Sequence, residues 1–128
     1  MTPVEFRRHI HQHPELSFEE HQTAQFIVEA LTAEGISCSR IADTGVVAKL
    51  EGRGDLTRAV VLRADIDALP IIENTGLDYA SVNEGIMHAC GHDMHAAILF
   101  GTLQKLNESR DFEGTIFGIF QPGEECNP

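Results

Sequence analysis

The chain has 128 residues, of which 42% are hydrophobic and 23% are charged. This length and composition predict one globular domain, neither disordered nor apolar enough to span a membrane. The net charge of −11 repels phosphate backbones, so a nucleic-acid partner is not expected. The polar N-terminus lacks the apolar stretch of a signal peptide, and three scattered cysteines are typical of free thiols or metal ligands. We therefore expect a cytoplasmic protein.

The N-terminal third predicts two helices. The first covers residues 4–13 and ends at Pro14, because proline disfavours a helical conformation in the residue before it. Ser17 and Glu20 have the spacing of a capping box and predict the start of the second helix, which ends at Gly35. The buried side of this helix is expected from residues at helical spacing, namely Thr23, Phe26, Ile27, Ala30 and Leu31.

Strands are predicted from residue 36 onwards. Short β-branched runs cover residues 36–41 and 45–50, and residues 59–62 are apolar throughout, as expected for a strand covered on both faces. Asp93 can cap a third helix, and residues 115–121 form another apolar run. Helices that alternate with buried strands indicate an α/β layered domain with a mixed sheet flanked by helices.

Polar residues follow two of these strands and precede the third helix. Asp65 and Asp67 follow one strand, residues 124–125 follow the other, and Cys90 and His92 lie at the start of the helix. In open α/β sheets, ligands bind beyond the carboxyl ends of the strands. We therefore expect the three clusters to meet there.

The stretch MHACGHDMH is the richest in metal-binding side chains. In an extended segment His88, Cys90 and His92 project to one side, and Gly91 permits a tight turn, so Cys90 and His92 could bind a metal together. Two alternatives stay open. One is a buried thiol beside histidines that bond to the backbone. The other is a nucleophilic Cys90 activated by His92.

The acidic pairs have alternatives of the same kind. Glu124 and Glu125 are either solvated surface charge or a pair in which one carboxylate binds a metal and the other handles protons. Asp65 and Asp67 either begin a turn or orient metal-binding histidines from behind. The remaining N-terminal histidines are interpreted as structural and partly exposed: His9, His11, His13 and His21.

Four motifs together carry a resemblance to a known family. RRHIHQHPELSFEEHQTA, LRADIDALP, MHACGHDMHAA and FQPGEE occur in the order and approximate spacing of the amidohydrolase branch of the co-catalytic metallopeptidases. That branch includes hippurate hydrolase, N-acyl-amino-acid amidohydrolases, N-acetyldiaminopimelate deacetylase and plant auxin-conjugate hydrolases. The resemblance implies a metal-dependent exopeptidase-like (phosphorylase/hydrolase-like) catalytic domain.

The resemblance also implies roles for single residues. Metal ligands are implied at Cys90, His92 and Glu125, the general base at Glu124, and a supporting aspartate region at Asp65 and Asp67. Members use two divalent ions, commonly zinc or manganese, with nickel or cobalt tolerated. The implied reaction is hydrolysis of N-acyl amino acids or small peptides by a metal-activated water. The implied partners are this small-molecule substrate and, in a full-length form, a second copy of the chain.

The chain departs from the family in length. Family members continue well past the GluGlu motif, with two further histidine ligands and a smaller lid or dimerisation domain. Residues 1–128 are therefore expected to form the N-terminal part of the catalytic domain, with at most weak activity alone. The alternative is a non-catalytic metal-binding or interaction module. The metal hypothesis fails if Cys90, His92 and Glu125 lie more than about 8 Å apart, since metal–ligand bonds are near 2 Å.

Overall fold

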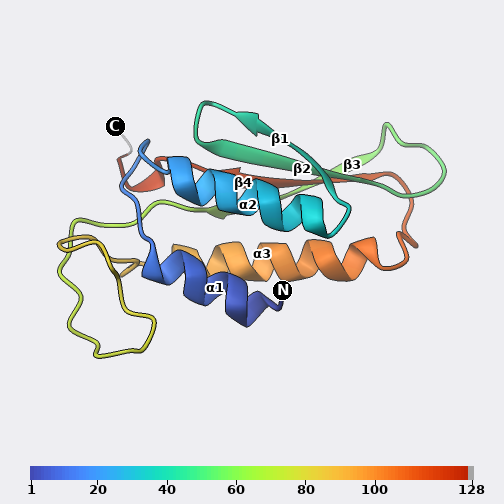
Figure 1. The fold of residues 1–128 in the computed structure, drawn as a ribbon. Coiled ribbons are helices and arrows are strands. Elements are labelled where there is room, and N and C mark those ends of the chain that lie inside the picture. The colour runs from blue at the N-terminus through green and yellow to red at the C-terminus, as the bar shows by residue number, and fades with distance from the viewer. Residues whose placement is uncertain (127–128) are drawn as a thin grey trace.

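A computed structural model describes residues 1–126 as a sheet with helices on one side (Figure 1). The three α-helices are α1 (Pro3–Gln12), α2 (His21–Ala33) and α3 (His92–Asn107). The strands are β1 (Ser37–Ile41), β2 (Gly45–Glu51), β3 (Ala59–Asp65) and β4 (Thr115–Gln121), and a short 3-10 helix, η1, covers Glu124–Cys126. The predicted helices and strands are all found, with ends that agree or differ by up to three residues.

The sheet is mixed, as predicted. Its strand order is β1-β2-β4-β3; β1 and β2 are antiparallel, as are β2 and β4, whereas β3 and β4 are parallel. The parallel pair places Asp65 opposite Gln121. The carboxyl ends of β3 and β4 therefore lie side by side, which brings the residues after both strands to one edge of the sheet.

The core lies between the helices and one face of the sheet. Alternate residues of β2, namely Val46, Ala48 and Leu50, are fully buried, and Val46 pairs with the buried Phe120 of β4. On the helix side, Phe6 of α1 stacks on Phe100 of α3 with ring centroids 4.4 Å apart. Burial of these apolar surfaces supplies the main driving force for folding.

The prediction that residues 59–62 are covered on both faces is wrong for the described part of the chain. Ala59, Val60 and Val61 are exposed, and Leu62 is half-buried. The reason is that β3 is one of the two edge strands of the described sheet. Within the described residues β3 pairs along one side only, with β4, and the helices cover one face of the sheet.

Two predicted helix caps are also wrong. The Ser17 hydroxyl bonds to Asp67, and the Glu20 side chain makes no cap bond to α2. Instead, Glu15 accepts hydrogen bonds from the first turn of α2. Helix α3 begins after Gly91, which is left-handed and offers no side chain, while Asp93 lies inside the first turn. In each case the predicted capping side chain is engaged in a long-range contact.

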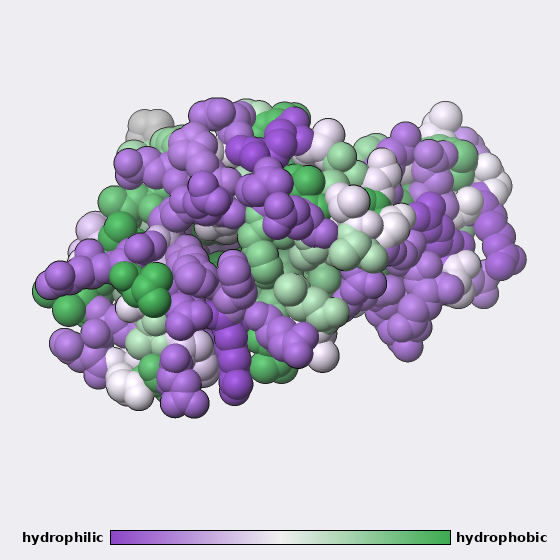
Figure 2. All heavy atoms as spheres, in the orientation of Figure 1, coloured by the Kyte–Doolittle hydropathy of each residue, from purple (hydrophilic) through white to green (hydrophobic). Residues whose placement is uncertain are grey.

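The surface seen in Figure 2 is mostly hydrophilic, with a smaller apolar area in the middle. This agrees with the composition of the chain, which has 20 acidic and 9 basic residues. None of the helices within residues 1–126 is long and apolar enough to cross a membrane.

Candidate metal centre

The three polar segments predicted from the sequence meet at the carboxyl ends of β3 and β4. Asp65 ends β3, Glu124 and Glu125 follow β4 after the turn at Gly123, and His92 begins α3. The chain turns into α3 at Gly91, whose φ of 106° favours glycine. Because the segment bends there, it is not extended through His92 as expected.

Two groups of possible metal ligands form at this place. Cys90, His92 and Glu125 make one group, and Asp65, His92 and Glu124 make the other. Within each group, one ligand atom from every residue lies within 4.8 Å of the others. The condition that Cys90, His92 and Glu125 lie within about 8 Å of one another is met, and His92 is shared between both groups.

The ring of His92 is held in one orientation. Its Nδ1 atom lies 2.9 Å from the backbone carbonyl oxygen of Asp67 and 3.1 Å from the Oδ1 atom of the same residue, so Nδ1 carries the hydrogen and donates it. Nε2 then faces Glu125 at 3.6 Å and both Asp65 and Glu124 at 3.9 Å. These distances are too long for hydrogen bonds.

This arrangement of His92 fits a cation. With Nδ1 donating to Asp67, the Nε2 atom faces three carboxylates, and their negative charges repel one another unless a positive charge lies between them. The only basic side chain paired with these groups in the described residues is Arg63, which bonds Asp65 Oδ1 at 2.9 Å. Thiolate, imidazole and carboxylate together are ligands that suit zinc and similar divalent metals.

The surroundings of Cys90 argue against its interpretation as a nucleophile. A hydrogen bond to Glu125, burial and the nearby carboxylates raise the pKa of the Cys90 thiol above its ordinary value. Reactive cysteines need the opposite, a positive environment that lowers the thiol pKa. A bound cation would supply that environment, so the thiol is better suited to metal binding.

Asp67 connects the parts of the site. Besides the contacts to His92, its Oδ2 atom accepts hydrogen bonds from the Ser17 hydroxyl at 2.7 Å and from the Glu125 N–H at 2.8 Å. Asp67 is only 1% exposed and belongs to neither ligand group. Its contacts therefore suit a supporting role, in which it orients His92 and fixes the backbone of Glu125.

Sequence reasoning missed the part played by Ser17 and Glu20. The fully buried Glu20 carboxylate accepts hydrogen bonds from the Gly123 N–H at 2.8 Å and from the Thr44 hydroxyl at 3.3 Å. Burial raises the pKa of Glu20. Glu20 thus holds the turn that presents Glu124. Both missed residues lie in the motif PELSFEE. The glutamate pair at its end has the pattern of exposed charged residues on a helix, so its sequence gives no sign of burial.

His88 was expected to project to the same side as Cys90 and His92, but it belongs to neither ligand group. It is 4% exposed, and both of its ring nitrogens lack a hydrogen-bond partner among the described residues. Burial, the largest cause, lowers the pKa of His88 to about 4. Of the N-terminal histidines, His11 is also buried rather than partly exposed.

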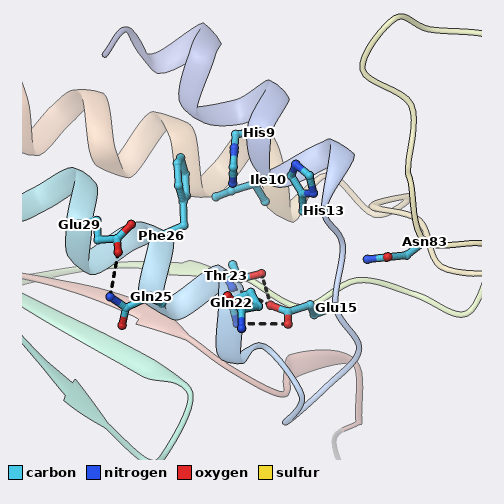
Figure 3. A pocket seen from close by; sticks show the side chains of 10 residues that line it. All are labelled: His9, Ile10, His13, Glu15, Gln22, Thr23, Gln25, Phe26, Glu29 and Asn83. Atoms are coloured by element: carbon cyan, nitrogen blue, oxygen red, sulfur yellow. Dashed lines mark hydrogen bonds between the residues drawn. The ribbon is translucent and has the colours of Figure 1, made fainter.

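A pocket of about 430 Å³ between α1 and α2 lies apart from these groups (Figure 3). His9 stacks on Phe26 there, with ring centroids 3.9 Å apart, and burial together with nearby His13 lowers the pKa of His9. Glu15 in the same pocket bonds to Thr23 at the start of α2. None of the residues that line this pocket belongs to either ligand group.

Comparison with known proteins identifies the family. Residues 61–128 match the model of Peptidase family M20/M25/M40. The chain belongs to this peptidase family. The resemblance noted from the four sequence motifs is thereby confirmed.

Two bacterial relatives of this M20 chain are named after reactions on amide bonds. It is 52% identical over 125 residues to the N-acetyl-L-cysteine deacetylase of Bacillus subtilis strain 168, covering 96% of this chain and 30% of that protein. It is 48% identical over 127 residues to the N-acyl-L-amino acid amidohydrolase of Geobacillus stearothermophilus, covering 98% and 34%. The chain thus spans about a third of the length of these relatives.

Two solved structures share the fold. The YXEP protein of Bacillus subtilis, described as a dinuclear metal binding peptidase, matches with a TM-score of 0.92 and 47% identity over 96% of this chain and 35% of that one. Aminoacylhistidine dipeptidase from Vibrio alginolyticus matches with a TM-score of 0.68 at 22% identity, over 98% and 28%, and shows likeness of fold alone. The α/β fold class is confirmed.

Proposed function

We propose that this chain is the N-terminal part of the catalytic domain of a metal-dependent amidohydrolase, which removes the acyl group from N-acyl amino acids or small peptides. The observation that carries the proposal is the meeting of Cys90, His92 and Glu125 around the free Nε2 atom of His92. The names of the relatives from Bacillus subtilis and Geobacillus stearothermophilus support the substrate class.

We propose two divalent ions, zinc or manganese before nickel or cobalt, as the cofactors. Cys90, His92 and Glu125 would hold one of them, and the group of Asp65, His92 and Glu124 lies beside it. The description of the YXEP protein as dinuclear supports the number of ions. When bound, such ions lower the pKa of a water towards neutrality and polarise an amide carbonyl.

The side chains of this chain supply the proton transfers and the orientation. Glu124, with its side chain 39% exposed, can take a proton from the attacking water on a carboxylate oxygen and deliver it to the departing amine. Asp67 keeps the hydrogen on Nδ1 of His92, so that Nε2 stays directed at the carboxylates. Asp65 is fixed by Arg63, which leaves its Oδ2 atom facing His92.

The experiment is an assay of N-acetyl and N-benzoyl amino acid hydrolysis with the longest form of the protein that the gene encodes. Chelation of divalent metals should abolish turnover, and Glu124→Gln should lower kcat about 10²–10⁴-fold, the usual contribution of a general base. Glu84→Gln, the same chemical change at an exposed loop position, should leave kcat unchanged.

Other outcomes favour other functions. Metal retention without turnover in the longest form would favour a non-catalytic metal-binding or interaction module. Inactivation by thiol alkylation together with indifference to chelators would favour cysteine-based hydrolysis. We also propose a cytoplasmic location, which the three free cysteines support. A homo-oligomer is proposed for a longer form on the basis of the family resemblance.

A further inference from the structure

A buried cluster of charged side chains lies behind the metal centre. His11 and Arg7 of α1 contact Asp93 of α3, and His11 also contacts Glu73 of the loop formed by residues 66–91. The side chains of His11, Glu73 and Asp93 are 3%, 3% and 1% exposed. Burying an unpaired charge costs folding free energy, so each charge in this cluster needs a partner. Loss of one partner is therefore more disruptive here than in an ion pair on the surface.

His11 is the centre of the cluster. Its Nδ1 atom lies 2.8 Å from Asp93 Oδ2, and its Nε2 atom lies 3.1 Å from both carboxylate oxygens of Glu73. Carboxylates accept hydrogen bonds, so a ring that carries hydrogen on both nitrogens satisfies both. Burial acts to raise the pKa of Glu73, but hydrogen bonds from Thr75, the Ser81 N–H and His11 outweigh it and lower that pKa. Glu73 is therefore the ionised partner of His11.

The two carboxylates belong to the two segments that carry the thiol and imidazole of the metal centre. Asp93 follows His92 directly in α3, and Glu73 lies in the same loop as Cys90. This loop, the long yellow-green segment beside α1 in Figure 1, contains no helix and no named strand. A loop of that length needs outside contacts to hold Cys90 in one place.

Helix α1 and the turn that follows it provide further contacts of this kind. Arg7 donates to the Tyr79 hydroxyl at 2.9 Å, the Val82 N–H donates to the Gln12 carbonyl at 2.9 Å, and Asn83 donates to the Pro14 carbonyl at 2.9 Å. These contacts fix the loop to α1. Arg7 and His11 each join the loop and α3 through a single side chain. His11 is the more buried of the two, with 3% of its side chain exposed against 25% for Arg7, and it alone contacts a carboxylate on both segments.

We propose that His11 is a positioning residue for the metal centre, and this inference rests on the proposed metal-binding function. By holding Asp93 and Glu73 together, His11 fixes the distance between the loop that carries Cys90 and the helix that carries His92. His11 does not bind the metal, since both of its nitrogens are occupied by carboxylates. Its effect reaches the ion through the placement of the thiol and the imidazole.

The test is Co²⁺ binding to the longest form of the protein, because thiolate-to-Co²⁺ absorption reports on Cys90 and the visible bands report on coordination geometry. His11→Ala should raise the Kd for Co²⁺ about 10-fold, the usual effect of losing outer contacts of a metal site, and should change the spectrum. His11→Gln can reach one carboxylate only and should give a smaller change of the same kind. His9→Ala, on the exposed side of the same helix, should change neither Kd nor spectrum.

All variants are compared at a temperature where circular dichroism shows them folded. If His11→Ala does not fold, Glu73→Gln takes its place, since it keeps the shape and removes the charge that faces His11. Unchanged Kd and spectrum in a folded variant of His11 or Glu73, with or without a lower Tm, would overturn the inference and leave the proposed function intact. Failure of the unaltered protein to bind Co²⁺ would overturn the proposed metal centre and the inference together.

Discussion

The Oδ1 atom of Asp67 lies 3.1 Å from Nδ1 of His92, while its Oδ2 atom accepts the N–H of Glu125 at 2.8 Å. One buried carboxylate therefore joins two candidate metal ligands that come from different parts of the chain. The imidazole is oriented through its side chain and the glutamate through its backbone. Asp67 can set the distance between them without contacting the ion.

Asp67→Asn is expected to weaken metal binding 10- to 100-fold, as changes of such supporting contacts usually do. The amide nitrogen cannot accept the hydrogens that Ser17 and Glu125 donate, so at least one of the present contacts is lost. Calorimetric titration with Zn²⁺ measures the effect. Asp78→Asn, at an exposed loop position, is the matched control, and an equal loss in both variants would contradict the role of Asp67.

Gly91→Ala is expected to destabilise the fold and the metal centre together. The φ of 106° is strained for any residue with a Cβ atom, at a cost of about 1–2 kcal/mol, although no neighbouring atom lies within 4 Å of the added methyl group. Urea denaturation measures the stability, and Zn²⁺ titration measures the site. Gly76→Ala has a comparable φ of 73° and equal space but lies away from Cys90, so it should lower stability alone.

Glu20→Gln is expected to reduce the pH dependence of the unfolding free energy. The pKa of Glu20 is raised by burial, so folding disfavours the ionised form, and the stability that the protonated side chain supports is lost as pH rises above the unfolded-state pKa. The stability of the variant relative to the unaltered protein should therefore rise from pH 4 to pH 7. Urea denaturation at several pH values gives this comparison.

Glu20→Ala provides the contrast to Glu20→Gln. It leaves the buried Gly123 N–H without an acceptor, which costs about 1–3 kcal/mol at any pH. Glu20→Gln keeps an oxygen that can accept this hydrogen bond, whereas Glu20→Ala does not. Equal losses of stability in the two variants at every pH would therefore contradict the role of the Glu20 side chain as the acceptor for Gly123.

Divalent cations are expected to raise the Tm of the protein, and chelators to lower it. A ligand at 100 times its Kd stabilises the folded state by about 2.7 kcal/mol, provided that it binds only that state. Differential scanning fluorimetry with Zn²⁺ or Mn²⁺ gives the shift. Cys90→Ala should reduce it, because the variant loses one ligand atom, whereas Cys38→Ala should not, because Cys38 lies on β1 away from both groups. Equal shifts in the two variants would point to binding elsewhere.

Local sequence patterns predicted the helices and strands, and the strand ends predicted where Asp65, Glu124 and Glu125 would meet. The helices and strands depend on residues close together in the chain, and the meeting point follows from the general rule that ligands bind beyond the carboxyl ends of strands in α/β sheets. The interpretation of residues 59–62 failed because exposure depends on which strand forms the edge of the sheet. That order is set by pairing between distant strands, which hydrophobic pattern alone does not encode.

The supporting residues could not be predicted for a related reason. Ser17 and Asp67 are 50 positions apart, and Glu20 and Gly123 are 103 apart. The local sequence predicts that Ser17 and Glu20 cap a helix. Only the packed structure shows that their side chains bond to distant residues instead. The sequence around His11 indicates only a structural histidine, because the two carboxylates that contact it lie 62 and 82 positions away in the chain.

The edge position of β3 has a practical consequence. Val60 and Val61 point to opposite faces and are 58% and 56% exposed, so the unpaired side of this strand is bordered by apolar groups above and below. Strands of this kind readily pair with other chains. For a preparation of residues 1–128 alone, we expect association along β3 to limit the usable protein concentration, and Val61→Lys should raise that limit.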